Sequence, residues 1–323
     1  MVGLPAEESN DTKQCRNDED SVNNGDGLLH KIYYTVNRGF VVNIRNRALP
    51  EGWYPSSEGE IRELLSEWKP KFHSRVGLSD IIAGIVPHAG RVLCGSIIAD
   101  VLSSFQKNLE TIIVLGGHNS PGGPVIEYSE DCWSLPSGDL SRDKGLSERV
   151  KVNLSEDISM VGERSVDNTV EVIMPLIAVM YPDVKWAAWR LPSDKSSIEF
   201  GKILASTVKE TGKRVAVIGS TDLTHYGANY GFTPRESLKS PVTWVKERDS
   251  RILRALAELE GKKALELAVE EHSACSAGAA VGAMTFARSL GCSNGQILNY
   301  STSRDVHPSS SFVGYGSIIW ESV

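Results

Sequence analysis

The feature of the sequence that most constrains the fold is a repeated alternation, from about Ile61 onward, between short β-branched runs and longer stretches with helical periodicity. Several runs are apolar on both faces, which is typical of strands buried between two layers of helices. We predict strands at residues 81–86, 111–115, 184–191, 214–218, 296–300 and 311–320, and helices at 58–68, 95–105, 169–180, 197–211, 242–259, 262–271 and 277–290. This order favours right-handed crossovers and an α/β fold: one layered domain with a central, mostly parallel or mixed sheet flanked by helices.

The N-terminal segment has a different composition. Its first 26 residues carry seven acidic and two basic side chains, and so account for five of the seven net negative charges of the chain. Residues 1–28 offer too little apolar surface to offset the entropy lost on ordering, and we predict a disordered acidic tail. Residues 29–46 form an extension whose short apolar runs could add an edge strand. Because the rest of the chain is nearly neutral, we expect no nucleic-acid partner.

The apolar segments and the cysteines also indicate the cellular compartment of the protein. No segment reaches the run of about 18 apolar residues that a membrane-spanning helix needs, and the N-terminal segment lacks the apolar core of a secretory signal. The cysteines are scattered without CxxC spacing, at Cys15, Cys94, Cys132, Cys275 and Cys292. We therefore expect reduced thiols in a cytoplasmic protein with no membrane span. Cys94 and Cys292 are predicted to lie in the core, and Cys132 in a loop without a partner.

Chemically capable side chains follow three of the predicted strands. His88 follows the run at 81–86, His118 follows the run at 111–115, and Asp222 and His225 follow the run at 214–218. In open α/β sheets, ligands bind beyond the carboxyl ends of the strands. If these strands are parallel, the four side chains converge at one edge of the sheet.

A cysteine could join this group. Cys275 opens a helix of small residues, and a helix N-terminus favours the thiolate, which is both a metal ligand and a nucleophile. His272 lies three residues earlier and could reach the same place. Each residue also has a structural interpretation: Asp222 as a turn cap, His225 as a ring packed beside Tyr226, and Cys275 as a small buried apolar residue. We assign no role to the remaining histidines, His30, His73 and His307.

Short motifs occur in order from about Arg47 to the C-terminus. They include Gly52-Trp53-Tyr54-Pro55, Val86-Pro87-His88-Ala89-Gly90, Leu115-Gly116-Gly117-His118, the string from Ser220 to Gly227, and Cys275-Ser276-Ala277-Gly278. This ordered series resembles the Memo family. The resemblance assigns residues 47–323 to a Memo-like α/β domain. It implies a fold similar to the class III extradiol, iron-dependent dioxygenases, with a pocket in the equivalent position.

The resemblance also implies roles for particular residues. His88 and His118 match two family histidines at a metal site, Cys275 matches the cysteine that faces them, and Asp222 with His225 matches a Ser-Asp-x-x-His string. The sequence departs from the family pattern in two places. The turn before His118 is one residue shorter, and Asn168 stands where the family has a pocket histidine, whereas Glu171 is kept.

Three functions agree with these residues. In the first, His88, His118 and Cys275 bind a transition metal, with Asp222 and His225 as catalytic acid or base in redox or O₂-linked chemistry. Two imidazoles and a thiolate suit iron or copper, and also zinc, but not Mg²⁺ or Ca²⁺. In the second, a non-catalytic scaffold uses a vestigial dioxygenase-like pocket to bind a small molecule, a peptide or a protein partner. In the third, Cys275 is the nucleophile of a hydrolase.

Overall fold

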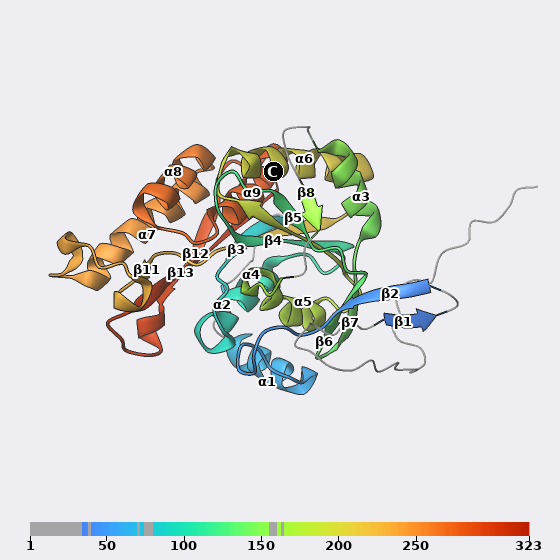
Figure 1. The fold of residues 1–323 in the computed structure, drawn as a ribbon, viewed down its shortest axis with the longest axis horizontal. Helices are drawn as coiled ribbons and strands as arrows, with labels where there is room; N and C mark the ends of the chain where they lie inside the picture. The colour runs from blue at the N-terminus through green and yellow to red at the C-terminus, as the bar shows by residue number, and fades with distance from the viewer. Residues whose placement is uncertain are drawn as a thin grey trace, which may run out of the picture.

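A mixed β-sheet forms the centre of the structure (Figure 1). The computed structural model describes residues 34–37, 40–69, 72–73, 80–154, 160–162 and 165–322. Within these residues the sheet has nine strands in the order β11-β13-β3-β10-β4-β9-β5-β8, with β12 paired to β13. The strands are β3 (Ile81–Val86), β4 (Thr111–Asn119), β5 (Val125–Glu127), β8 (Met160–Gly162), β9 (Lys185–Pro192), β10 (Val215–Ser220), β11 (His225–Tyr226), β12 (Gln296–Thr302) and β13 (Phe312–Glu321).

Four neighbouring strands, β3, β10, β4 and β9, run parallel to one another, and β13 runs antiparallel to β3. Their side chains alternate between two apolar layers because successive residues of a strand point to opposite faces. Ile113 and Leu115 belong to one core with residues of α6 and α9, whereas Ile112 and Val114 belong to a second core with residues of α2 and α5. The predicted mixed α/β fold is confirmed.

The helices cover both faces of this sheet: α6, α9 and α3 lie over one face, and α2, α4, α5 and α1 lie over the other (Figure 1). The helices are α1 (Glu58–Trp68), α2 (Arg91–Ser104), α3 (Lys144–Asn153), α4 (Asn168–Glu171), α5 (Met174–Met180), α6 (Lys195–Thr211), α7 (Pro241–Ala257), α8 (Gly261–Glu271) and α9 (Ala277–Ser289). Short 3₁₀ turns are η2 (Ala228–Tyr230), η3 (Arg235–Ser237) and η4 (Ser303–Asp305).

A second, four-stranded sheet lies beside the first. It consists of β1 (Tyr34–Asn37), β2 (Phe40–Arg45), β6 (Cys132–Leu135) and β7 (Gly138–Ser141), in the order β1-β2-β6-β7. The expected edge strand is therefore found, as a hairpin that pairs with β6. Cys132 was expected in a loop but is buried in β6, and it is disulfide-bonded. The prediction of a reduced Cys132 is wrong, whereas Cys94, Cys275 and Cys292 are free thiols.

Several predicted boundaries need correction. The helix predicted at 169–180 is two helices, because Pro175 lies in the first turn of α5 and has no N–H with which to continue a preceding helix. Helix α2 begins at Arg91, four residues before the predicted start, and β4 extends to Asn119, so His118 lies within the strand. The predicted tail, residues 1–28, lies outside the described residues. Across the described residues, no helix combines the length and apolar character needed to span a bilayer.

Candidate metal centre

The parallel strands bring the predicted site residues to one edge of the sheet. In the register of these strands, Ser220 of β10 pairs with Val86 of β3, and Gly219 of β10 pairs with Leu115 of β4. The segments that leave these three strands therefore start at the same level. The sequence places His88, His118 and Asp222 within three residues of these positions, which explains why they meet.

His88 lies in the connection between β3 and α2 and is held on four sides. Its backbone N–H donates to Asp222 Oδ1 at 2.8 Å, and its carbonyl oxygen accepts from Asn168 Nδ2 at 3.1 Å. The ring nitrogen Nδ1 lies 3.0 Å from the Ser220 hydroxyl, and Nε2 lies 3.2 Å from Cys275 Sγ. Only 1% of the side chain is exposed. The ring orientation is therefore fixed by the protein, with Nε2 directed at the thiol.

His118 reaches the same point through an irregularity in β4. The pairing of β4 with β9 shifts register between Gly116 and Asn119, and Gly117 has a φ of 100°, a left-handed conformation that favours glycine. Any Cβ at Gly117 would collide with Arg190, and its N–H donates to Thr169 Oγ1 at 2.7 Å. As a result the ring of His118 stands perpendicular to that of His88, with 5.1 Å between the ring centroids.

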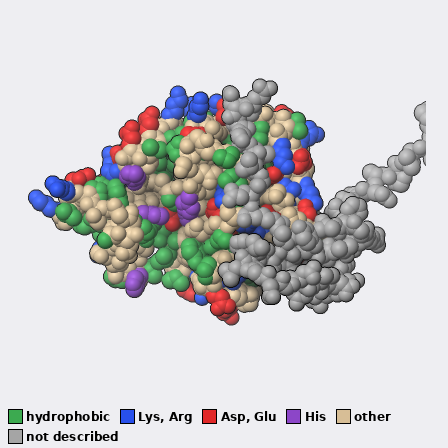
Figure 2. All heavy atoms as spheres, in the orientation of Figure 1, with side chains coloured by type: hydrophobic (Ala, Val, Ile, Leu, Met, Phe, Trp, Pro, Cys, Tyr) green, Lys and Arg blue, Asp and Glu red, His purple; other side chains and the backbone are tan. Residues whose placement is uncertain are grey.

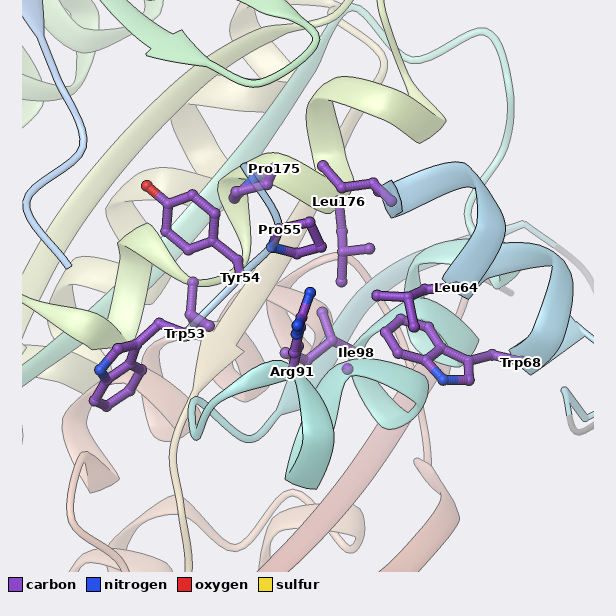
Figure 3. A pocket seen from close by; sticks show the side chains of 12 residues that line it. Trp53, Tyr54, Pro55, Leu64, Trp68, Arg91, Ile98, Pro175 and Leu176 are labelled. Carbon is purple, nitrogen blue, oxygen red and sulfur yellow. The ribbon is translucent and has the colours of Figure 1, made fainter. Parts of the chain in front are cut away.

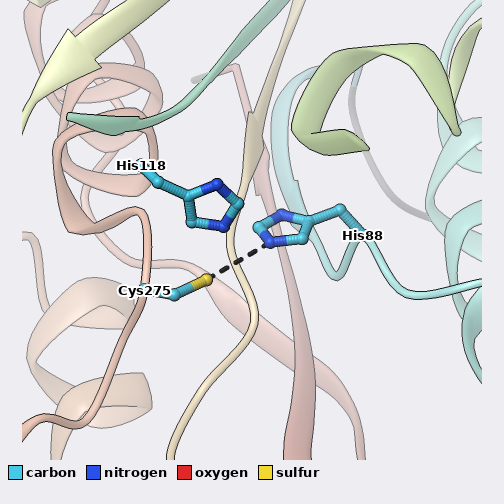
Figure 4. Close-up of side chains that lie close together, drawn as sticks. All are labelled: His88, His118 and Cys275. Atoms are coloured by element: carbon cyan, nitrogen blue, oxygen red, sulfur yellow. Dashed lines mark hydrogen bonds between the residues drawn. The ribbon is translucent and has the colours of Figure 1, made fainter. Parts of the chain in front are cut away.

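Cys275 arrives from the other end of the chain, one residue before the N-cap of α9. Its N–H donates to the carbonyl of Asp222 at 3.1 Å, and the next N–H, of Ser276, donates to Thr221 Oγ1 at 3.1 Å. These two bonds fasten the start of α9 to the segment that follows β10. They place Sγ opposite the two imidazoles (Figure 4).

The three side chains form a cluster in which one ligand atom from each lies within 4.8 Å of the others. Donors that bind one ion at about 2.0–2.3 Å lie within roughly 4.5 Å of one another, so only a small side-chain movement is needed. The nitrogen, nitrogen and sulfur donors suit a transition metal, and the Ser220 hydroxyl on Nδ1 of His88 is the kind of partner that orients a ligating histidine. The cluster fits a metal ion.

Asp222 and His225 lie next to the cluster. Asp222 Oδ2 is 3.9 Å from Nε2 of His88 and 3.9 Å from Nε2 of His225. The His225 ring lies 5.0 Å from the ring of Tyr230, and its Nε2 is buried without a hydrogen bond to any described residue. The carboxylate therefore lies between two imidazoles without a direct hydrogen bond to either ring.

Burial controls the protonation of these groups. It lowers the pKa of His88 to about 3, an effect that the nearby His118 reinforces, and it raises the pKa of Cys275 to about 12. It also raises the pKa of Asp222 to about 6 and lowers the pKa of His225. Without an ion, His88 and Cys275 are therefore a neutral imidazole and a neutral thiol at pH 7. An ion bound there must displace the thiol proton.

An open cleft of about 410 Å³ leads to the cluster. Its walls include Leu223, His225, Tyr230, Phe232, His272 and Cys275. Histidine side chains are grouped on the face seen in Figure 2. A different pocket, between α1, α2 and α5, is lined by apolar side chains and Arg91, encloses only about 20 Å³, and contains no residue of the cluster (Figure 3).

Most of the predicted residues are brought together, and some are not. His272 lines the cleft with its ring against Phe232, whereas His73 pairs with Asp100 and has no part in the cluster. Sequence reasoning missed two contacts of His88, those from Ser220 and Asn168. Ser220 stands in the string that follows β10, so its position was a usable signal, whereas Asn168 comes from a distant helix.

The fold and cluster define a class: mixed α/β proteins in which a His-His-Cys group that could hold a metal lies at the carboxyl edge of the parallel strands. The family model described as Memo-like protein matches residues 45–319. The chain therefore belongs to the Memo-like protein family, as its motifs predicted.

Relatives that match the chain over nearly their full length support this assignment. A MEMO1 family protein of Thermococcus onnurineus is 27% identical over 290 residues, covering 86% of this chain and 99% of the relative. MEMO1 family proteins of Pyrococcus furiosus and Pyrococcus abyssi are 27% and 28% identical, covering 84% and 85% of this chain and 98% and 99% of the relatives. Among solved structures, an uncharacterized protein of Escherichia coli K12 matches with a TM-score of 0.44 and 13% identity, covering 73% of this chain and 98% of that one.

Proposed function

We propose that the chain binds a transition metal ion through His88, His118 and Cys275 and that the ion serves redox or O₂-linked chemistry on a small molecule. The observation that carries the proposal is the cluster itself: three donors from distant parts of the chain lie within 4.8 Å of one another. Iron and copper suit the donor set and the proposed chemistry, and zinc suits the donor set. When bound, the ion would supply Lewis acidity or electron transfer.

The chain's own residues would handle substrate and protons. A small molecule entering the cleft meets the rings of Tyr230 and Phe232 on its way to Cys275. His225 is neutral at pH 7 because burial lowers its pKa, so it can accept a proton from a bound group. Asp222 lies 3.9 Å from that ring and would stabilise the resulting imidazolium.

Metal content tests this proposal directly. Protein purified without an affinity tag should contain close to one equivalent of iron, copper or zinc, and His88→Ala, His118→Ala and Cys275→Ser should each lose most of it. His73→Ala and Cys292→Ser are matched controls outside the cluster and should keep the wild-type content. Equal, negligible metal in all of these proteins would refute the proposal.

A binding role without catalysis is the second candidate, and the open cleft favours it because a peptide side chain could enter beside the exposed ring of Tyr230. The same metal analysis distinguishes the two candidate functions. If the wild-type protein contains no metal, the cleft is better explained as a recognition site. The hydrolase interpretation is weaker, because the raised pKa of Cys275 leaves little thiolate at neutral pH.

A further inference from the structure

The short segment from Asp222 to His225 carries both side chains that flank the proposed metal ligands. Strand β13 holds one side of it: Leu223 N–H donates to the Gly314 carbonyl at 2.9 Å, and Gly314 N–H donates to the Thr224 carbonyl at 3.0 Å. The Thr224 N–H is not bonded to the backbone of this strand. It donates instead to Oδ1 of Asp249, on α7, at 3.1 Å.

Asp249 is completely buried and makes a second contact. Its Oδ2 accepts from the Tyr300 hydroxyl of β12 at 2.9 Å, so the carboxylate links α7, β12 and the segment that follows β10. The side chain also packs directly against Gly314, where any Cβ would collide with Oδ2. The carboxylate is therefore held by two hydrogen bonds, one of which is to the backbone of Thr224.

Structural stability alone is a poor reason for an ionisable group in this position. Burial raises the pKa of Asp249 to about 6, so keeping it ionised at neutral pH costs free energy. A buried carboxylate that is costly to ionise, and whose hydrogen bond fixes the backbone between two site residues, is better explained by a role at the site.

We propose that Asp249 is a positioning residue that sets where Asp222 and His225 stand relative to the metal ligands. It touches neither the cluster nor the cleft. It acts through Thr224, which directly precedes His225 and lies two residues after Asp222. Asp222 in turn holds the backbone of His88 through its Oδ1. The expected effect on metal binding rests on the proposed function. The positioning of Asp222 and His225 rests on the geometry alone.

The test uses two measurements on the full chain. The first is Co²⁺ affinity, followed by the absorbance of the bound ion. The second is the imidazole NMR resonance of His225 in chelator-treated protein, assigned with His225→Asn. Asp249→Ala removes the acceptor of Thr224, whereas Asp249→Asn keeps the Oδ1 acceptor and the volume. Asp249→Leu also removes the acceptor but fills the volume, and it serves if Asp249→Ala does not fold.

Asp249→Ala and Asp249→Leu should weaken Co²⁺ binding about 10-fold, as the loss of a group that supports a metal site does, and should move the His225 resonance. Asp249→Asn should stay near the wild type in both measurements. Asp143→Ala, which removes another buried, hydrogen-bonded carboxylate away from the cluster, should change neither. If the variant that folds, Asp249→Ala or Asp249→Leu, leaves the His225 resonance unmoved, Asp249 is structural only and the inference is wrong. If wild-type protein does not bind Co²⁺, the metal proposal fails, and the resonance still decides the role of Asp249.

Discussion

At the scale of single residues, the site is built from ionisable groups that burial forces toward neutrality. Asp222 is 5% exposed and His88 is 1% exposed, yet each is retained where an apolar side chain would pack at lower cost. Such groups cluster where a protein needs a ligand or a proton rather than stability. Their cost to folding should therefore be measurable.

The raised pKa of Asp222 determines how its contribution to the stability of the fold changes with pH. The pKa rises from 3.8 to about 6 in the folded protein, so the folded state binds this proton more tightly than the unfolded state does. Below about pH 4 the carboxyl group is protonated in both states, and its ionisation costs the fold no free energy. The cost grows as the pH rises toward 6 and reaches its full value above that pH. A shift of this size corresponds to about 3 kcal/mol.

Asp222→Asn should therefore stabilise the metal-free fold relative to wild type at pH 8 by up to about 3 kcal/mol more than it does at pH 4. Urea unfolding of chelator-treated protein at the two pH values measures the difference. Asp183→Asn, at an exposed position where the carboxylate stays hydrated, is the matched control and should show no such change. A difference between Asp222→Asn and wild type that is the same at both pH values would contradict the prediction.

Cys275 shows what a residue-level prediction can miss. Its place before a helix of small residues indicated a stabilised thiolate, but the structure raises the pKa of the thiol to about 12 because burial outweighs the helix terminus and Asp222 lies close by. The position of the residue along the chain was a sound signal, whereas its burial depends on the packing of distant segments. Charge state therefore could not be predicted from neighbours in sequence.

At the scale of elements, α9 holds Cys275 in place because its small side chains let it lie close to the sheet. Its residues from Ala277 to Ala287 are buried, and Gly278 faces the carbonyl of Pro192 at the end of β9, where a Cβ would collide with backbone. Backbone of this kind cannot yield as a flexible side chain can. The start of α9, and Cys275 with it, is therefore set by this contact.

Gly278→Ala should push the start of α9 away from β9, destabilise the fold by about 1–3 kcal/mol and lower the metal content in parallel with Cys275→Ser. Gly59→Ala on α1 is the control, because no atom lies within 4 Å of the new Cβ. The control should be neutral or stabilising, since alanine favours a helix over glycine. Denaturant unfolding measures the stability, and elemental analysis measures the metal content. A Gly278→Ala protein with wild-type stability and metal content would show that this contact does not set the position of α9.

Elements with one clear periodicity were predicted well, and elements set by tertiary contacts were not. The parallel strands and α6 to α9 follow from runs of apolar residues, and their bounds differ from prediction by a few residues. Strands β5 to β8 and helix α3 were missed, because short or mostly polar segments carry little periodic signal. The bulge that places His118 is equally invisible in sequence, since it depends on the fit of Gly117 against Arg190.

At the scale of the molecule, the convergence of the site follows from topology. Parallel strands put their carboxyl ends at one edge, so residues after β3, β4 and β10 were predictable neighbours. The approach of Cys275 was not implied by that rule, because it precedes a helix rather than following a strand; its place at a helix start only allowed it to join the group, and the family resemblance set it opposite the two histidines. Bonds from Asp222 and Thr221 to the start of α9 now supply the physical reason.

With this topology, a metal ion bound as proposed would be a long-range cross-link. His88 and Cys275 are 187 residues apart in sequence, and Sγ of Cys275 lies 3.2 Å from Nε2 of His88. Loss of such a cross-link requires the parallel sheet and α9 to separate. A bound ion should therefore stabilise the fold as a whole rather than a local loop, through its preference for the folded state.

Adding Zn²⁺ to chelator-treated protein at about 100 times its dissociation constant should stabilise the fold by about 2.7 kcal/mol, which for a chain of this size raises the melting temperature by roughly 5 °C. Mg²⁺ at the same concentration should have no effect, because it requires oxygen ligands. Cys275→Ser should abolish most of the shift with Zn²⁺, whereas Cys292→Ser should retain it. Equal shifts with both ions, or a shift that survives Cys275→Ser, would place the binding elsewhere. Hydrogen exchange measures whether the stabilisation is global, since a cross-link at this point must slow amide exchange in β3, β4 and α9 together.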